Sequence, residues 1–280
     1  MRKVLLVAGF AFQEAVRRRL IQVLAGVAAL LLLLYGFAMR SAWNEALAAM
    51  NELQAQAVAL TVTQLVLGVL NFLITGAAIF LGAGSISGEV RDGSLHVLLP
   101  RSITRTQYYL GKLLALICMT LTFGGLLSGG VGIISALVGP GFPPGYGWAL
   151  LSLALPPLFL VVLTQSLSTR MGTAAAAIVG IVAWVLAEVG MLLEGISSIT
   201  LNESLRSGGI LISLLIPVDA VYRWFTDRWI AAMGPVGAIQ RSLNGMLTGS
   251  TPSLWMLLWA AGWFLAVAWL GSRSFRTRDL

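Results

Sequence analysis

Long runs without a charged residue constrain this chain more than any other feature of its sequence. Residues 60–85 and 113–146 contain no Asp, Glu, Lys or Arg. A helix of about 20 predominantly apolar residues is long enough to cross the hydrocarbon core of a bilayer. Because the backbone polar groups of a lipid-embedded segment must bond to each other, such runs form helices in a membrane. The sequence therefore predicts an integral membrane protein made of helices.

The composition agrees with a membrane protein and argues against a soluble domain. Only 10% of the 280 residues are charged and 58% are hydrophobic, whereas soluble domains carry about 25% charged residues. The net charge of +7 does not indicate a nucleic-acid-binding protein, because the basic residues lie beside the apolar runs rather than along one polar surface. We expect membrane lipid, and no nucleic acid, around this chain.

Six apolar segments have the length of membrane spans. The predicted spans are residues 20–39, 59–84, 109–137, 148–167, 172–193 and 254–270. Residues 1–19 mix apolar and basic positions, which favours an amphipathic helix on the cytoplasmic interface over a cleaved signal peptide. Residues 41–57 predict a short external helix, and residues 195–250 an external or re-entrant region, because their longest apolar stretch is too short to span. The predicted fold is one all-α, multi-pass domain over residues 1–280.

The distribution of basic residues predicts the orientation. With the N-terminus inside, thirteen of the 18 Lys and Arg residues and four of the 11 acidic residues lie on the inner side. An excess of Lys and Arg in short loops marks the cytoplasmic side of a membrane protein. Both termini and residues 86–105 are therefore predicted to be cytoplasmic.

Residues 86–105 form a strongly polar segment between two apolar runs. The residues that give it order are Glu89, Arg91, Asp92, Gly93, Ser94, Leu95, Leu98, Leu99, Pro100 and Arg105. Its leucines recur at three-and-four spacing, so one helical face would be apolar and would lie on the bilayer surface. The alternative is a solvated turn between two spans.

This segment resembles the intracellular signature of ABC transporter permeases of the second, six-helix exporter type. The resemblance is carried by Glu89, Gly93, Ser94, Leu95, Leu98, Leu99, Thr104, Arg105, Gly111 and Lys112. It implies that the segment is a coupling helix, which docks into a groove on a separate ATPase subunit and carries its motion into the membrane. Such permeases often have a proline just before the Ser/Thr-Arg pair, where this chain has Ser102, and its own proline is Pro100.

The resemblance also implies partners and a location. Two copies of an ABC ATPase and a second permease chain, identical or related, would complete a dimeric exporter in a prokaryotic cytoplasmic (inner) membrane, and a periplasmic or extracellular protein is a further candidate partner. The ATPase-coupling residues would be Glu89, Arg91, Asp92, Gly93, Ser94, Leu95, Leu98, Leu99 and Arg105. ATP and Mg would bind to the partner ATPase, because this chain lacks the Gly-x-x-x-x-Gly-Lys-Ser/Thr motif that holds them. No cofactor and no catalytic residue are expected on this chain.

Polar residues inside the predicted spans are candidates for a transport pathway. Gln64, Asn71 and Thr75 fall near one stripe of the second span, and Glu188 lies in the outer third of the fifth. A carboxylate at membrane depth is costly unless it faces protein, water or a cation. The alternatives are hydrogen bonds between helices and, for Glu188, hydration near the outer headgroups.

A short external motif follows the fifth span. Pro217 can start a helix, and Asp219 and Arg223 are four residues apart, so they would pair on one helical face. Over these few residues the chain also resembles the permease of the nitrous-oxide-reductase copper-site maturation transporter. The alternative is a capped short helix with a purely structural role.

The sequence contains few candidate residues for a metal site or for a catalytic site. The chain has a single histidine, His96, and a single cysteine, Cys118, so a His/Cys metal site is not expected. An intramembrane enzyme needs paired acids, a Ser with a base or a His cluster, and Glu188 has no acidic partner in the predicted spans. The expected function is that of a transporter subunit coupling ATP hydrolysis on a partner to substrate movement. The alternatives are a metal-site maturation permease exporting a sulfur species, a non-ABC channel and an intramembrane enzyme.

Overall fold

The structure is a computed structural model that describes residues 2–17, 19–91, 104–248 and 251–277. Within these ranges short turns connect helices, and there is no strand. The helices are α1 (Arg2–Arg17), α2 (Arg19–Ala49), α3 (Glu52–Gly84), α4 (Ser87–Arg91), α6 (Arg105–Val138), α7 (Tyr146–Ala154), α8 (Pro157–Ser168), α9 (Thr173–Thr200), α10 (Glu203–Leu215), α11 (Val218–Ala232), α12 (Pro235–Thr248) and α13 (Leu254–Arg276).

Six of the helical segments are long and apolar enough to cross a membrane. They are Ile21–Ala49, Glu52–Arg91, Arg105–Val138, Tyr146–Ser168, Thr173–Thr200 and Leu254–Arg276. Helices α10 and α11 are long and apolar enough only when they are taken together, and a bend of 102° separates them, as in a broken span or a re-entrant loop. The predicted all-α fold with several membrane-length helices is therefore confirmed.

The first two long helices form a hairpin that differs from the prediction. Residues 41–57 do not make a separate helix, because α2 continues to Ala49 and α3 already begins at Glu52. No Gly or Pro interrupts the good helix formers after Arg40. Asn51 then starts α3 with a capping box. Its side chain accepts a hydrogen bond from the Gln54 backbone N–H, and the Gln54 side chain accepts one from the Asn51 backbone N–H. At about 1.5 Å per residue, α2 is about 46 Å long, which exceeds a hydrocarbon core of about 30 Å.

The fourth predicted span is broken where its prolines stand. Helix α7 ends at Ala154 and α8 begins at Pro157, so Leu155 and Pro156 separate two short helices. Proline lacks the N–H that would continue the helical hydrogen bonds, and its ring clashes with the preceding turn. The interruption expected from the Pro156-Pro157 pair is therefore observed.

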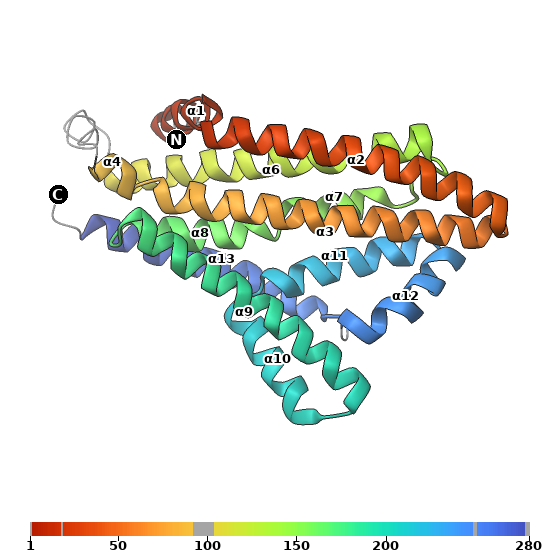
Figure 1. Ribbon diagram of the computed structural model, residues 1–280. Helices are drawn as coiled ribbons and strands as arrows, with labels where there is room; N and C mark the ends of the chain where they lie inside the picture. The colour runs from red at the N-terminus through yellow and green to blue at the C-terminus, as the bar shows by residue number, and fades with distance from the viewer. Residues whose placement is uncertain (1, 18, 92–103, 249–250, 278–280) are drawn as a thin grey trace.

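Figure 1 shows how the helices are arranged. Helices α2, α3 and α6 run alongside one another, α8 and α13 lie beside them, and α1 sits across one end. Both termini and α4 lie at that same end, which we call the terminal end. An even number of complete spans brings the two termini to one side of a membrane, as the six-span prediction requires.

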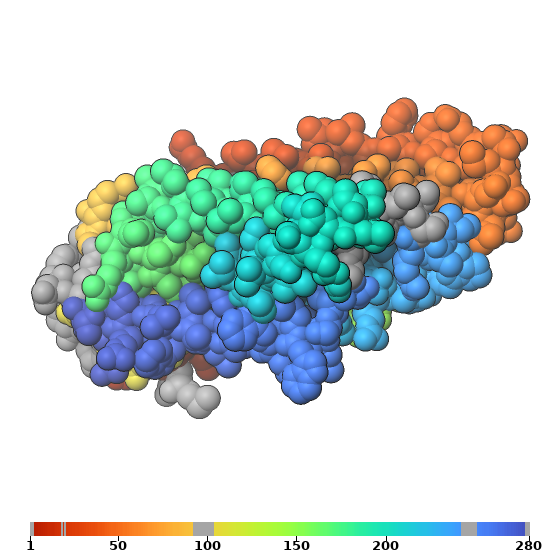
Figure 2. Space-filling view, turned by 90° about the horizontal axis from the view of Figure 1, so that it is seen from below, coloured from red at the N-terminus to blue at the C-terminus, as the bar shows by residue number. Residues whose placement is uncertain are grey.

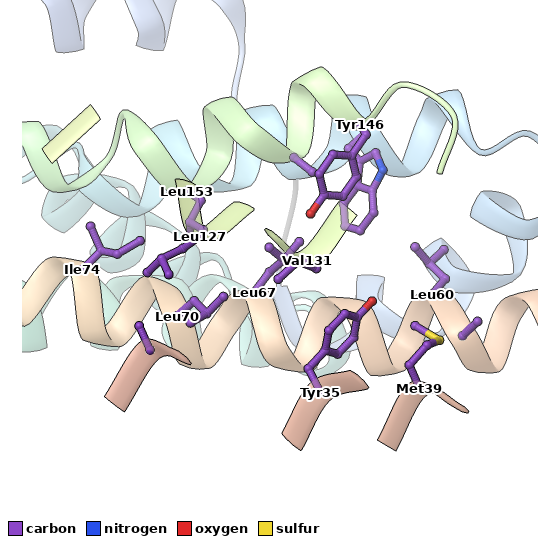
Figure 3. Packing of buried hydrophobic residues seen from close by; sticks show 14 of the residues in the cluster. Tyr35, Met39, Leu60, Leu67, Leu70, Ile74, Leu127, Val131, Tyr146 and Leu153 are labelled. Carbon is purple, nitrogen blue, oxygen red and sulfur yellow. The ribbon is translucent and has the colours of Figure 1, made fainter. Parts of the chain in front are cut away.

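Figure 3 shows the core that joins α2, α3, α6 and α7. The labelled side chains are Tyr35, Met39, Leu60, Leu67, Leu70, Ile74, Leu127, Val131, Tyr146 and Leu153, all buried. The Tyr35 hydroxyl and Thr63 Oγ1 lie 3.0 Å apart, and the Tyr146 hydroxyl donates to the Ser128 carbonyl at 2.8 Å. Both phenols are thus paired, which avoids the cost of unsatisfied buried polar groups.

The outward faces of the long helices carry large apolar side chains. Phe37 on α2, Leu137 on α6 and Trp255 on α13 are each more than three quarters exposed. Soluble proteins rarely expose contiguous apolar surface on this scale. The arrangement suits helices whose outer faces contact lipid.

Helices α9 and α10 form a hairpin whose tip points away from the other helices (Figure 1), while α9 also packs against α3, α8 and α12. Figure 2 shows this hairpin on one face of the molecule, between α13 and the α2–α3 hairpin. The two helices approach closely at Gly190 and Gly209, where a Cβ atom added to Gly209 would lie 2.8 Å from the Gly190 carbonyl oxygen. Small residues of this kind let membrane helices pack backbone to backbone.

Candidate functional site: a cavity between α3, α9 and α11

A cavity of about 570 Å³ lies between α3, α9 and α11. Its lining residues are Gly68, Asn71, Phe72, Trp184, Val185, Glu188, Val189, Met191, Leu192, Val218, Asp219 and Tyr222. The volume is in the range of about 300–1,000 Å³ typical of small-molecule sites. Phe72 and Leu192 are more than half exposed, so the cavity opens to the surface of the chain.

The structure brings two of the four predicted pathway residues into this cavity. Asn71 lies on α3 and Glu188 on α9, and both line it. The Asn71 side-chain oxygen is buried, and no described group donates a hydrogen bond to it. Next to Asn71, the Phe72 ring meets the Trp184 ring edge to face, with centroids 4.5 Å apart. Aromatic rings and polar groups therefore lie side by side on the wall.

Glu188 is held by its own helix. The Trp184 indole nitrogen donates to Glu188 Oε1 at 3.0 Å, one turn away on α9. Trp184 itself is buried, at 8% exposure. A neutral donor orients the carboxylate but does not compensate its charge.

The other two pathway candidates lie elsewhere. Gln64 Oε1 accepts a hydrogen bond from Gln240 Nε2 on α12 at 2.8 Å. Thr75 is completely buried among helices, and neither residue lines the cavity. For Gln64, the alternative of a hydrogen bond between helices describes what is observed.

The external motif forms part of a buried ionic cluster behind the cavity. Arg223 Nε donates to Asp219 Oδ2 at 2.7 Å, the pair that the spacing predicts. The two terminal nitrogens of Arg223 also donate to both oxygens of Glu194, at 2.8 and 2.9 Å. Ser213 on α10 donates to Glu194 Oε1 at 3.2 Å. The cluster thus ties α9, α10 and α11 together.

Sequence reasoning missed Glu194 and Ser213. Glu194 is buried, and its partner Arg223 lies 29 residues further along the chain. Local spacing reveals pairs within one helix and gives no signal for a contact at that separation. A bidentate contact between Arg and a carboxylate is the strong geometry for such a pair.

Acidic groups outnumber basic groups around the cavity. Glu188 and Asp219 line it, and both Glu188 and Glu194 act electrostatically on Asp219. Against these three carboxylates stands one guanidinium, that of Arg223, which pairs with Glu194 and Asp219. Of the described residues that line the cavity, none is Lys, Arg or His. The local formal charge is therefore negative.

A second ionic cluster lies at the terminal end, at the start of the predicted coupling segment. Glu89 on α4 pairs with Lys112 on α6, and Lys112 Nζ lies 3.5 Å from Glu14 Oε2 on α1. Glu89 and Lys112 are both buried, at 9% and 7% exposure. The Glu89 carboxylate therefore faces the neighbouring helices of its own chain, a position that the sequence pattern did not predict.

The remaining coupling residues divide into two groups. Arg91 is exposed at the end of α4, and Arg105, at the start of α6, donates to the Arg276 carbonyl at 3.2 Å. Asp92, Gly93, Ser94, Leu95, Leu98 and Leu99 lie outside the described residues. Among the residues that the structure describes, no group of three or more His, Cys, Asp and Glu is arranged to hold a metal ion.

Comparisons with known proteins give no family for this chain. No family model matches it, and no curated protein matches it. The resemblance to ABC permeases therefore stays a prediction that rests on residues 89–112.

Proposed function

We propose that this chain is the transmembrane subunit of an ABC-type exporter, moving its substrate through a path that includes the cavity between α3, α9 and α11. The observation that supports this most is the continuity of α3. One end of this helix leads into α4 and residues 86–105, and its middle carries Asn71 and Phe72 on the cavity wall. The two places are about 20 Å apart along the helix axis. A rigid helix transmits a push at one end to the other.

The ionic cluster at the terminal end supports the same role. Glu89, Lys112 and Glu14 join α4, α6 and α1 through two buried charges, Glu89 and Lys112, and the half-exposed Glu14, so the start of the coupling segment is fixed to two other helices. Breaking a buried ion pair by removing one partner is costly. In this proposal Glu89 is a positioning residue, which transmits movement without touching the ATPase. Two ATPase subunits would bind and hydrolyse ATP, and a second permease chain would complete the pathway.

An intramembrane enzyme is less well supported. The structure does give Glu188 a second carboxylate nearby, Asp219, and paired acids are what acid–base catalysis needs. Asp219 is engaged by Arg223 at 2.7 Å, however, which holds it as part of the structural cluster. The same cluster gives Asp219 and Arg223 a structural role, and Pro217 immediately precedes α11, so the motif is explained without the export of a sulfur species. A passive channel would not need the ionic cluster around Lys112.

The test is to purify the chain from its native membrane in mild detergent and identify what accompanies it. We expect a stoichiometric ATPase, two copies of this chain and ATP hydrolysis by the preparation. A lone chain without ATPase activity would contradict the proposal and favour a channel or an enzyme.

A substitution tests the mechanical part. Glu89→Gln removes the charge that pairs with Lys112, so we expect a weaker ATPase association and a lower rate of substrate-stimulated ATP hydrolysis. The control is Glu203→Gln on α10, whose side chain is 84% exposed. Both variants should insert into the membrane, and equal turnover by Glu89→Gln and wild type would remove the coupling role.

A further inference from the structure

We propose that the cavity between α3, α9 and α11 binds an organic cation with an aromatic or other bulky apolar body. That this cation is the transported substrate rests on the proposed function. Binding itself is a property of this chain alone, so it can be measured without the ATPase.

The charge of the cavity is the first step. The hydrogen bond that orients Glu188 comes from the neutral indole of Trp184. The guanidinium of Arg223 is directed at Asp219 and Glu194, with all three of its nitrogens engaged. Among the described residues none forms an ion pair with Glu188, so we infer that a bound cation compensates this carboxylate and that an anion would be repelled.

The walls of the cavity select the kind of cation. Phe72, Trp184 and Tyr222 supply aromatic rings, and the remaining lining residues are mostly aliphatic. Aromatic faces attract organic cations, most strongly where water is excluded. Hard metal ions instead need about six oxygen ligands, which this lining does not offer because Asp219 is already bound by Arg223.

The size and opening of the cavity fit such a ligand. Its volume of about 570 Å³ accommodates a molecule of drug size. Because the exposed Phe72 and Leu192 form part of the lining, a ligand can enter from the side of the chain. The buried Asn71 oxygen, to which no described group donates, adds an acceptor for a ligand that carries an N–H group.

The test uses two ions of the same shape and opposite charge. Tetraphenylphosphonium and tetraphenylborate are added to the purified chain in nanodiscs of neutral lipid, and binding is measured by equilibrium dialysis against empty nanodiscs. We expect saturable binding of the phosphonium and only lipid partitioning of the borate. Glu188→Gln keeps the shape and an acceptor for Trp184, and it should weaken phosphonium binding by at least about tenfold, as expected for losing a close charge pair at reduced dielectric.

Two matched controls locate the effect in this cavity. Glu203→Gln removes an exposed acid of α10 and should bind the phosphonium like wild type. Phe72→Ala should weaken binding, whereas Phe80→Ala, at an exposed ring of the same helix outside the cavity, should not. Equal binding of both ions, or unchanged phosphonium binding by Glu188→Gln, would overturn the inference. If the chain binds the phosphonium but copurifies with no ATPase, the cation site is supported and the exporter proposal is contradicted.

Discussion

Arg223 is the residue on which the α9–α11 region most depends. It is 6% exposed and satisfies two buried carboxylates, Asp219 and Glu194, at once. A lone charge at such a site costs several kcal/mol, whereas a well-bonded ionic cluster compensates most of that cost.

Replacing this guanidinium should therefore destabilise the chain strongly. We expect Arg223→Gln to lower the stability by about 3–5 kcal/mol, because Glu194 and Asp219 would stay buried without a cation. Thermal unfolding in detergent measures the effect. Arg206→Gln, at a half-exposed side chain, is the control and should unfold close to wild type. An Arg223→Gln variant as stable as wild type would show that the cluster contributes little.

What the sequence predicts at this scale depends on distance along the chain. The Asp219–Arg223 pair follows from a spacing of four in a helix. Glu194 binds the same guanidinium from another helix, and nothing in its local sequence separates it from a hydrated acid. Asn71 and Glu188 could be chosen as polar residues in apolar runs, but their meeting in one cavity depends on which helices are neighbours.

At the scale of elements, apolar runs predict where helices lie and prolines predict where they break, whereas a charged residue does not mark a helix end. The break between α7 and α8 follows from Pro156-Pro157. The predicted first span, residues 20–39, ends where Arg40 interrupts the apolar run, but the helix continues to Ala49. Helix formation depends on backbone hydrogen bonds and on residue propensity. Because arginine is a good helix former, a single arginine does not end a helix.

The close approach of α9 and α10 gives a prediction with an adjacent control. In Gly209→Ala the new Cβ would lie 2.6 Å from Glu194 Cγ and 2.8 Å from the Gly190 carbonyl oxygen, so backbone must shift. We expect a loss of about 1–3 kcal/mol, as for other overpacked sites. In Gly208→Ala the nearest atom is 4.0 Å away, so this variant should unfold at or above the wild-type temperature. Equal behaviour of the two variants in thermal unfolding would contradict the observed packing.

At the scale of the whole molecule, both termini lie at one end and the α2–α3 turn lies at the other (Figure 1). Basic residues predict that the terminal end is cytoplasmic. The lipid-facing surface and the number of membrane-length helices could be predicted from composition, but the splayed α9–α10 hairpin could not, because it depends on glycine contacts between the two helices.

Cysteine labelling tests this orientation. The one native cysteine, Cys118, is replaced by serine, and a cysteine is then introduced either as Glu52→Cys or after residue 280. A membrane-impermeant maleimide should label Glu52→Cys in intact cells, and the added C-terminal cysteine only after the membrane is opened. The reverse labelling would invert the topology and remove residues 86–105 from the side on which ATP is available.

The length of the α2–α3 hairpin has a practical consequence. If the start of α2 is level with one face of the hydrocarbon core, about 15 Å of helical pair extends past the other face, through the headgroup layer and beyond it, since α2 is about 46 Å long and the hydrocarbon core about 30 Å. A capping box makes the tip of this projection a defined shape. An antibody fragment raised against the tip would give a membrane protein of 29.7 kDa a rigid landmark for aligning particles in electron microscopy.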